Sequence, residues 1–255
     1  MPADWLPELL RAEPRRRLRD EGRGVLSVLP PEEGHAGRFE GLYGGLYDRA
    51  IQSDALRRLA PIAYGDAGPV GDLDSFVVRV ATQTQPAKSG EPPVLLDVPA
   101  GGGTLLPRLW QRGYRGRVVA SDLGTAMLER AAAISERVPL DIALLRADAQ
   151  DLPLKANTVD AAVSLNGLHV MPDPQRFVEE LGRVVRRRGR LFLATLVSGG
   201  NLRSDAILRA GRVAGIIPTP PPTRETLLRW LADAGFASQV PLGGTGLIGI
   251  AATRR

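Results

Sequence analysis

The stretch that decides the fold of this 255-residue chain reads Val94-Leu95-Leu96-Asp97-Val98-Pro99-Ala100-Gly101-Gly102-Gly103. A short apolar run ends in an acid and a glycine cluster follows, a pattern typical of a buried parallel strand that turns into a helix. Glycines let the backbone pass close beneath a ligand, because no Cβ stands in the way. In doubly wound α/β folds, nucleotide-like ligands bind at this carboxyl end of the strands. The stretch therefore predicts a ligand-binding turn in an α/β domain.

Strand and helix patterns alternate downstream of this turn. The predicted strands cover 94–98, 117–122, 142–146, 159–165 and 190–196. The predicted helices between and after them cover 104–113, 125–137, 174–185 and 224–234. Such alternation implies a parallel sheet with right-handed crossovers. Two apolar runs, 237–241 and 247–252, are joined by the Gly-rich turn 243–246 and predict a closing antiparallel hairpin.

The residues before this core differ in composition. Residues 1–37 are rich in charge, Pro and Gly and hold one weak strand signal at 24–29. Residues 38–63 carry apolar side chains at helical spacing, and a further helix is expected around 76–80. We therefore predict two units, an N-terminal helical cap or lid over residues 1–90 and a ligand-binding core over residues 91–255.

Composition excludes several classes of protein. The chain has no cysteine, which excludes disulfides, thiolate catalysis and cysteine-ligated zinc, and no metal site is predicted. No stretch approaches the roughly 18 apolar residues of a membrane helix, and the first residues do not resemble a signal peptide. We therefore expect a cytoplasmic protein without a membrane span.

The charge balance bears on nucleic-acid binding. The net charge is +5, from 33 basic and 28 acidic residues, and arginine clusters stand at 15–19 and 186–190. These clusters leave a nucleic-acid partner open. A solvated surface is the favoured interpretation, since aromatic residues for base stacking are missing from both clusters.

Acidic residues follow two of the predicted strands where a nucleotide-like ligand needs them. Asp122 closes the second strand, where a carboxylate can accept hydrogen bonds from both ribose hydroxyls. The alternative role for Asp122 is an N-cap for the next helix. Asp148 follows the third strand and could accept a bond from an adenine amino group, with Leu123 and Met127 flanking the base.

The glycine turn favours S-adenosylmethionine (SAM) over NAD. A dinucleotide fingerprint requires G-x-G-x-x-G, whereas Gly101-x-Gly103 is followed by Thr104-Leu105-Leu106. NAD sites pack that helix tightly under a pyrophosphate, and SAM has no phosphate. The structural alternative is that these glycines only form a tight strand-to-helix turn.

Together these motifs resemble class I SAM-dependent methyltransferases, and more narrowly the type 11 group that includes ubiquinone and menaquinone biosynthesis methyltransferases. The segments that carry the resemblance are 96–103, 121–122, 147–153, 160–164, 168–169, 177–181 and 189–191. The resemblance implies a Rossmann-like, doubly wound, seven-stranded sheet with an antiparallel last strand. It also implies SAM as cofactor and S-adenosylhomocysteine (SAH) as product. Two departures are visible: Pro99 replaces a usual glycine, and Arg187-Arg188 replaces a common Pro-Gly turn.

The resemblance also implies which residues bind the cofactor. The methionine half lies against one turn, made of Asp97, Pro99, Ala100, Gly101 and Gly103. Asp122 holds the ribose, while Asp148 and Ala149 meet the adenine. Asn166 and Leu168 lie near the sulfonium.

Four further residues are candidates on the acceptor side. His169 follows the fourth strand and is a candidate general base for a hydroxyl or phenol, since an ordinary histidine pKa lies near 6.5. Its alternative role is to shape the cleft wall. His35 could fold over the site or be a plain surface residue. Tyr43 or Tyr47 resembles the family's N-terminal aromatic that closes over the cofactor, although the pair, four residues apart, could also be core.

We therefore expect a SAM-dependent methyltransferase for a small, apolar or aromatic metabolite, acting as a monomer or homodimer. Apolar residues within 201–222 suggest part of the acceptor pocket. One alternative is an RNA methyltransferase, motivated by the arginine clusters, although the Asn/Asp-Pro-Pro-Tyr signature of many nucleic-acid methylases is absent. Another alternative is a SAM-binding protein that transfers no methyl group.

Overall fold

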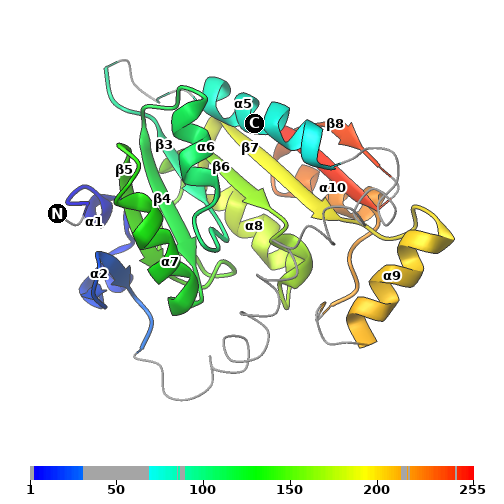
Figure 1. The fold of residues 1–255 in the computed structure, drawn as a ribbon, viewed down its shortest axis with the longest axis horizontal. Helices are drawn as coiled ribbons and strands as arrows, with labels where there is room; N and C mark the ends of the chain where they lie inside the picture. Colours follow the sequence, from blue (N-terminus) through cyan, green and yellow to red (C-terminus); the bar gives the residue numbers. More distant parts are fainter. Residues whose placement is uncertain are drawn as a thin grey trace.

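The computed structural model describes residues 3–30, 69–84, 86, 90–213, 217, 219–244 and 246–255. Within these residues a nine-stranded sheet runs in the order β1-β2-β5-β4-β3-β6-β7-β9-β8 (Figure 1). Its parallel centre consists of β3 (Val94–Asp97), β4 (Arg117–Asp122), β5 (Asp141–Arg146), β6 (Val159–Leu165) and β7 (Val185–Leu196). The closing hairpin is β8 (Phe236–Gly243) and β9 (Leu247–Arg254), and β9 lies antiparallel to β7. The predicted seven-stranded core with an antiparallel last strand is confirmed.

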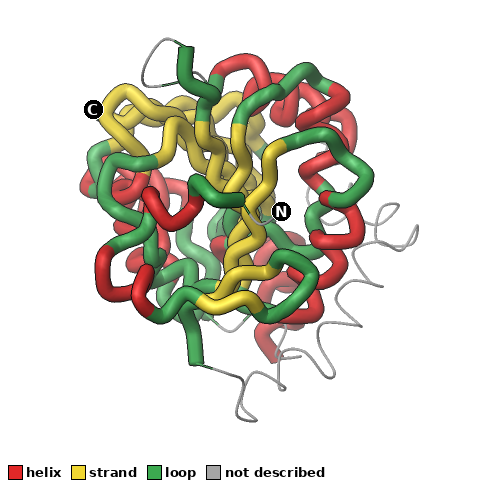
Figure 2. Tube along the Cα trace, turned by 90° about the vertical axis from the view of Figure 1, so that its left-hand side faces the viewer, coloured by secondary structure: helices red, strands yellow, loops and turns green. Residues whose placement is uncertain are grey.

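The sheet reverses its winding at β3. The strand β4 pairs with one side of β3, and β6, which comes later in the chain, pairs with the other side. The connections that leave the carboxyl ends of β3 and β6 therefore lead away from each other. The crevice between two such connections is where open α/β sheets bind ligands. All four residues of β3 are buried, as expected for a strand with helices on both faces. Figure 2 shows helices on both sides of the strands.

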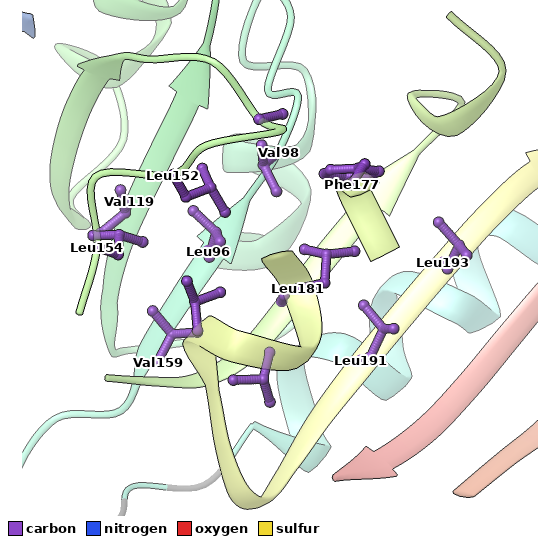
Figure 3. Close-up of a cluster of buried hydrophobic side chains, with 14 of the residues drawn as sticks. Leu96, Val98, Val119, Leu152, Leu154, Val159, Phe177, Leu181, Leu191 and Leu193 are labelled. Atoms are coloured by element: carbon purple, nitrogen blue, oxygen red, sulfur yellow. The ribbon is translucent and has the colours of Figure 1, made fainter. Parts of the chain in front are cut away.

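Side chains that alternate along the strands divide the core into two faces. One face carries α5 (Pro69–Gln83), α6 (Leu105–Gln111) and α7 (Thr125–Ser135). The other face carries α1 (Leu6–Leu9), α8 (Pro174–Val184) and α10 (Arg224–Asp233). Figure 3 shows Phe177 and Leu181 of α8 beside Leu96 of β3 and Leu193 of β7. This packing fixes β3 and β6, whose ends form the candidate site.

The first residues of the chain are built into this core. After α1 come α2 (Ala12–Arg16), β1 (Arg19–Asp20) and β2 (Val25–Ser27). The strand β2 pairs in parallel with β5 and so extends the sheet beyond β5. The strand β1 pairs antiparallel with the outer side of β2. Trp5 and Leu6 are buried in the largest core cluster. The strand predicted from the weak signal at 24–29 is confirmed as β2. Its pairing with β5 near the edge of the sheet was not predicted.

Two other elements differ from the prediction. The strand β7 begins at Val185, so the arginine cluster 186–190 lies inside a strand. Arg186 pairs with the carboxylate of Asp160, and Arg190 donates to Thr253 and Gln83. The segment 201–222 contains α9 (Leu202–Val213), which packs through Leu208 against a small cluster at the end of β7. No helix in the described part of the chain is long and apolar enough to cross a bilayer.

Candidate functional site

The carboxyl ends of β3, β4, β5 and β6 meet at one edge of the sheet, because these four strands are parallel neighbours. The turns that leave this edge carry Asp97, Asp122, Asp148 and the 3₁₀ helix η2 (Leu168–Val170). The structure thus brings together acidic residues that lie more than 20 residues apart in sequence. Tyr43, Tyr47 and His35 lie outside the described residues.

The turn after β3 depends on glycine. Gly103 has a φ of +75°, and a Cβ there would lie 3.0 Å from the Cα of Ala131 on α7. The Gly103 N–H donates to the Ala100 carbonyl at 3.1 Å, which closes the turn. At Gly101, by contrast, a Cβ would meet no atom within 4 Å. The turn therefore packs tightly against α7 at Gly103 and has free space beside it at Gly101. Backbone of this kind can lie directly beneath a ligand.

Asp97 is a buried acid with an unsatisfied oxygen. Its side chain is only 3% exposed, and Oδ2 has no hydrogen-bond partner among the described residues. Burial, with a smaller effect from the charge of Asp122, raises the pKa of Asp97 to about 8. A buried carboxyl of this kind is stabilised by a cation that arrives with a ligand. The ammonium of the methionine half of SAM fits that requirement.

Asp122 connects two turns of the site. Its Oδ2 accepts the Gly101 N–H at 2.8 Å and its Oδ1 accepts the Gly124 N–H at 2.9 Å. The N-cap of α7 is Gly124, so the alternative role of Asp122 as N-cap residue is wrong. The carboxylate is half-buried and lies between the glycine turn and the start of α7, a position that suits the predicted contact with ribose hydroxyls.

The predicted adenine contacts come from two neighbouring loops. Leu123 is 53% exposed, which is unusual for a leucine so close to a buried sheet, and Met127 is half-buried. Asp148 accepts the Gln150 N–H at 2.8 Å through Oδ1, and Ala149 is buried beside it. The apolar surface of Leu123 and the carboxylate of Asp148 suit the predicted contacts with an adenine.

The turn after β6 contacts the glycine turn through Pro99. A Cβ at Gly167 would lie 2.2 Å from Cδ of Pro99, so the proline ring occupies the space that a side chain at 167 would need. The proline ring at position 99 is thus accommodated by the absence of a side chain at Gly167. Asn166 beside it is exposed and has a φ of +59°.

Leu168 and His169, in the turn after β6, are both buried. The Leu168 side chain is fully buried in the largest core cluster, so only its backbone can face a ligand. His169 is 7% exposed, and its Nδ1 has no hydrogen-bond partner among the described residues. Burial lowers the pKa of His169 to about 4, so the imidazole is neutral at pH 7.

Sequence reasoning missed the residues that support the site from behind. Glu180 on α8 is buried and accepts the Leu152 N–H at 2.9 Å, and Arg183 donates to the carbonyls of Leu152 and Leu154. This pair holds the chain that leaves Asp148. The available signal was a Glu and an Arg three residues apart on a helix, which usually indicates a surface pair. Arg146, a charged residue at the end of an apolar strand, was a clearer sign of a buried ion pair.

The close approach of Pro99 and Gly167 leads to a prediction. The Gly167→Ala variant should lose stability by about 1–3 kcal/mol, because the new methyl group overlaps the proline ring. Adding Pro99→Gly should recover most of the loss, although the single Pro99→Gly variant itself costs chain entropy. Thermal unfolding of the wild type, both single variants and the double variant measures the coupling. Additive losses would show that the two residues do not interact.

Comparison with known proteins agrees with this geometry. Residues 96–193 match the family described as Methyltransferase domain (Methyltransf_11). The chain is 28% identical over 177 residues to a demethylmenaquinone methyltransferase of Paenarthrobacter aurescens, covering 62% of this chain and 67% of that protein. It is 31% identical over 168 residues to a protein of the same name from Clavibacter sepedonicus, covering 56% and 65%. Matches to uncharacterised mycobacterial proteins span only 35% or 38% of their length.

The fold is shared with solved structures of low identity. A SAM-dependent methyltransferase from Aquifex aeolicus superposes with a TM-score of 0.54 at 22% identity, covering 88% of this chain and all of that one (100%). The same arrangement of strands thus recurs with little sequence in common. The chain carries a class I SAM-dependent methyltransferase domain, with SAM as the cofactor, and it resembles the methyltransferases of menaquinone biosynthesis.

Proposed function

We propose that this chain transfers a methyl group from SAM to a small, apolar or aromatic metabolite. The observation that carries the proposal is the buried Asp97, whose Oδ2 has no hydrogen-bond partner in the described part of the chain, together with Asp122 and the open face of Gly101. This arrangement fits a ligand with a cationic end and a ribose. The likeness to demethylmenaquinone methyltransferases favours an aromatic, apolar acceptor of the quinol type.

The residues of the chain would act mainly by holding and aligning the reactants. SAM, when bound, supplies a methyl group already activated on a sulfonium. Asp97 and the turn 98–103 would bind its methionine half, Asp122 the ribose, and Asp148 with Leu123 the adenine. Alignment and exclusion of water in such a site are worth up to roughly 7–11 kcal/mol. We therefore infer that positioning rather than acid–base chemistry accounts for most of the rate.

The division into an N-terminal cap (residues 1–90) and a SAM-binding core (residues 91–255) is part of this proposal. Residues 3–30 add strands to the sheet, and residues 76–81 pack on its face. The roles proposed for Tyr43, Tyr47 and His35 on the acceptor side concern residues outside the described part of the chain and rest on the family resemblance. The cytoplasmic location and the monomeric or homodimeric state stay predictions.

The RNA methyltransferase alternative has less support. Arg186 and Arg190 are engaged with Asp160, Thr253 and Gln83, which leaves Arg187 and Arg188 as the exposed members of that cluster. In the cluster at 15–19, Arg17 pairs with Glu13 and Arg19 contacts Glu21, which leaves Arg15 and Arg16 exposed. Two exposed cations at each of two places make a small electrostatic footprint for a nucleic acid. Binding of RNA by the purified protein, with an affinity that falls steeply as the salt concentration rises, would favour this alternative.

Calorimetric titration with SAM, SAH and NAD tests the cofactor assignment. Micromolar binding of SAM and SAH and no binding of NAD is the expected result. A screen of quinols and phenols with methyl-labelled SAM then tests transfer. Cofactor binding without a labelled product from any acceptor would favour a SAM-binding protein that transfers no methyl group. No binding of SAM or SAH would overturn the proposed function.

His169 is proposed as the base for a hydroxyl acceptor. The His169→Gln variant should lower turnover by about 10²-fold or more and leave SAH affinity unchanged. Because burial holds the pKa near 4, the wild-type histidine is already unprotonated above pH 5, and turnover should show no His169 titration between pH 6 and 8. The test measures turnover against pH for both proteins. Normal turnover in the variant would reduce His169 to a residue of the cleft wall.

A further inference from the structure

Arg146 is a buried charge that joins two distant parts of the chain. It ends β5 and is only 4% exposed. Its Nε–H donates to the Leu123 carbonyl at 3.3 Å. Its Nη1 donates to the Glu21 carboxylate at 3.2 Å and to the Pro30 carbonyl at 3.4 Å. One guanidinium thus connects residues 19–30, here called the N-terminal arm, to the loop after β4.

The Leu123 carbonyl lies in the loop to which the proposed function assigns the adenosine half of SAM. Leu123 stands between Asp122, the proposed ribose ligand, and Gly124, whose N–H binds Asp122 at 2.9 Å. On the other side, the Ala147 N–H donates to the Asp122 carbonyl at 3.0 Å. Holding the Leu123 carbonyl therefore fixes the loop that presents both the Asp122 carboxylate and the exposed Leu123 side chain.

The N-terminal arm supplies the charge that Arg146 needs. A guanidinium taken out of water is costly unless a carboxylate and further acceptors satisfy it. Glu21, whose side chain is 20% exposed, provides that carboxylate. The pairing of β2 with β5 places Ser27 opposite Arg146, and the Val28 N–H bonds to the Arg146 carbonyl at 3.5 Å. When the arm is docked, Arg146 is held in the orientation that reaches Leu123.

We propose that Arg146 is a positioning residue for the adenosine half of SAM, and that the N-terminal arm sets cofactor affinity through the Glu21–Arg146–Leu123 contacts. The inference rests on the proposed function, because it concerns the same cofactor site. Since such coupling is reciprocal, bound SAM also holds the arm against β5. The arm is then a part of the cofactor site that acts through Arg146 and the Leu123 carbonyl.

Three variants separate this role from simple stabilisation. Glu21→Gln removes the carboxylate that contacts Arg146 at 3.2 Å, and with it the longer contact to Arg19 at 3.7 Å, without touching the loop. Arg146→Lys keeps a positive charge for Glu21 and loses the fork that also reaches Leu123. Trp5→Phe is the matched control: it removes the bond from Trp5 Nε1 to Asp141 at 2.8 Å, which ties the N-terminal residues to the opposite end of β5.

Two measurements are made on each full-length protein. The first is the dissociation constant for SAH by calorimetry. The second is hydrogen exchange of residues 120–128 in the ligand-free protein, which reports the loop without any cofactor. Glu21→Gln and Arg146→Lys should weaken SAH binding by roughly five- to tenfold and speed exchange of the loop by a similar factor. Trp5→Phe should lower the melting temperature and leave both readouts at wild-type values.

The outcomes distinguish this inference from the proposed function. If Glu21→Gln changes neither SAH affinity nor exchange of the loop, the inference is overturned. If all three variants weaken SAH binding equally, the contacts only stabilise the fold, and the inference is also wrong. If the wild type binds no SAH, the proposed function fails, while exchange of the loop still decides whether the arm and the loop are coupled.

Discussion

The Asp122→Ala variant is expected to bind SAM and SAH about 30- to 150-fold more weakly than the wild type. A hydrogen bond from a ligand hydroxyl to a charged acceptor is worth roughly 1.5–3 kcal/mol, so losing the carboxylate that holds the ribose should cost about 2–3 kcal/mol in all. The carboxylate also holds the N–H groups of Gly101 and Gly124, so its removal loosens two turns of the site. Calorimetric titration of the purified variant measures the loss.

A ligand without ribose hydroxyls separates these two effects. With the 2′,3′-dideoxy analogue of SAH, Asp122→Ala should cost little beyond the loosening of the turns. A loss of equal size for SAH and the analogue would mean that Asp122 only orders the backbone. Asp151→Ala is the control variant, since its exposed carboxylate pairs with Arg11 at 2.8 Å and is not a proposed ligand of the cofactor, so SAH affinity should stay near the wild-type value.

Much of the fold could be predicted because its signals are local. The strands β4 and β6 begin and end where their apolar runs do, and α8 begins after Asp173, which caps it by accepting the Arg176 N–H. The positions of Asp97, Asp122 and Asp148 at one edge followed from the parallel order of their strands. Such features need only the sequence pattern and the rule that parallel strands end at the same edge.

The features that escaped prediction depend on long-range contacts. The strand β2 is three residues long and pairs with residues more than 100 positions away, so its place in the sheet has no periodic signal. The contact of Arg146 with Glu21 depends on that pairing. The burial of the Leu168 side chain in a cluster with residues of α8 and β7 likewise depends on packing that no local pattern contains.

Asp97 is expected to release a proton when SAM binds. With a pKa of about 8, close to nine-tenths of the unliganded protein carries a proton on Asp97 at pH 7. The ammonium of the methionine half favours the ionised carboxylate and lowers that pKa, so the proton leaves. Titrations in phosphate and in Tris, which differ in ionisation enthalpy, should show close to one proton released per SAM bound in the wild type.

Asp160 shows that burial alone does not leave a carboxylate without hydrogen-bond partners. Asp160 is buried to a similar extent, but it accepts the Val94 N–H at 2.7 Å and pairs with Arg186. Oδ2 of Asp97 has no such partner among the described residues. The Asp97→Asn variant should therefore release no proton and bind SAM more weakly. Equal binding enthalpies in both buffers for the wild type would contradict the assignment.

The same group should make the unliganded protein less stable as the pH rises. The folded state keeps the Asp97 proton up to about pH 8, whereas the unfolded chain loses it near 3.8, so the folded state binds more protons between these values. Stability then falls with rising pH by at most about 1.4 kcal/mol per pH unit in that window. Denaturant unfolding between pH 5 and 8 should show this slope in the wild type and a flatter profile in Asp97→Asn. Saturating SAM should also flatten the wild-type profile, because the positive charge of the bound cofactor lowers the pKa of Asp97.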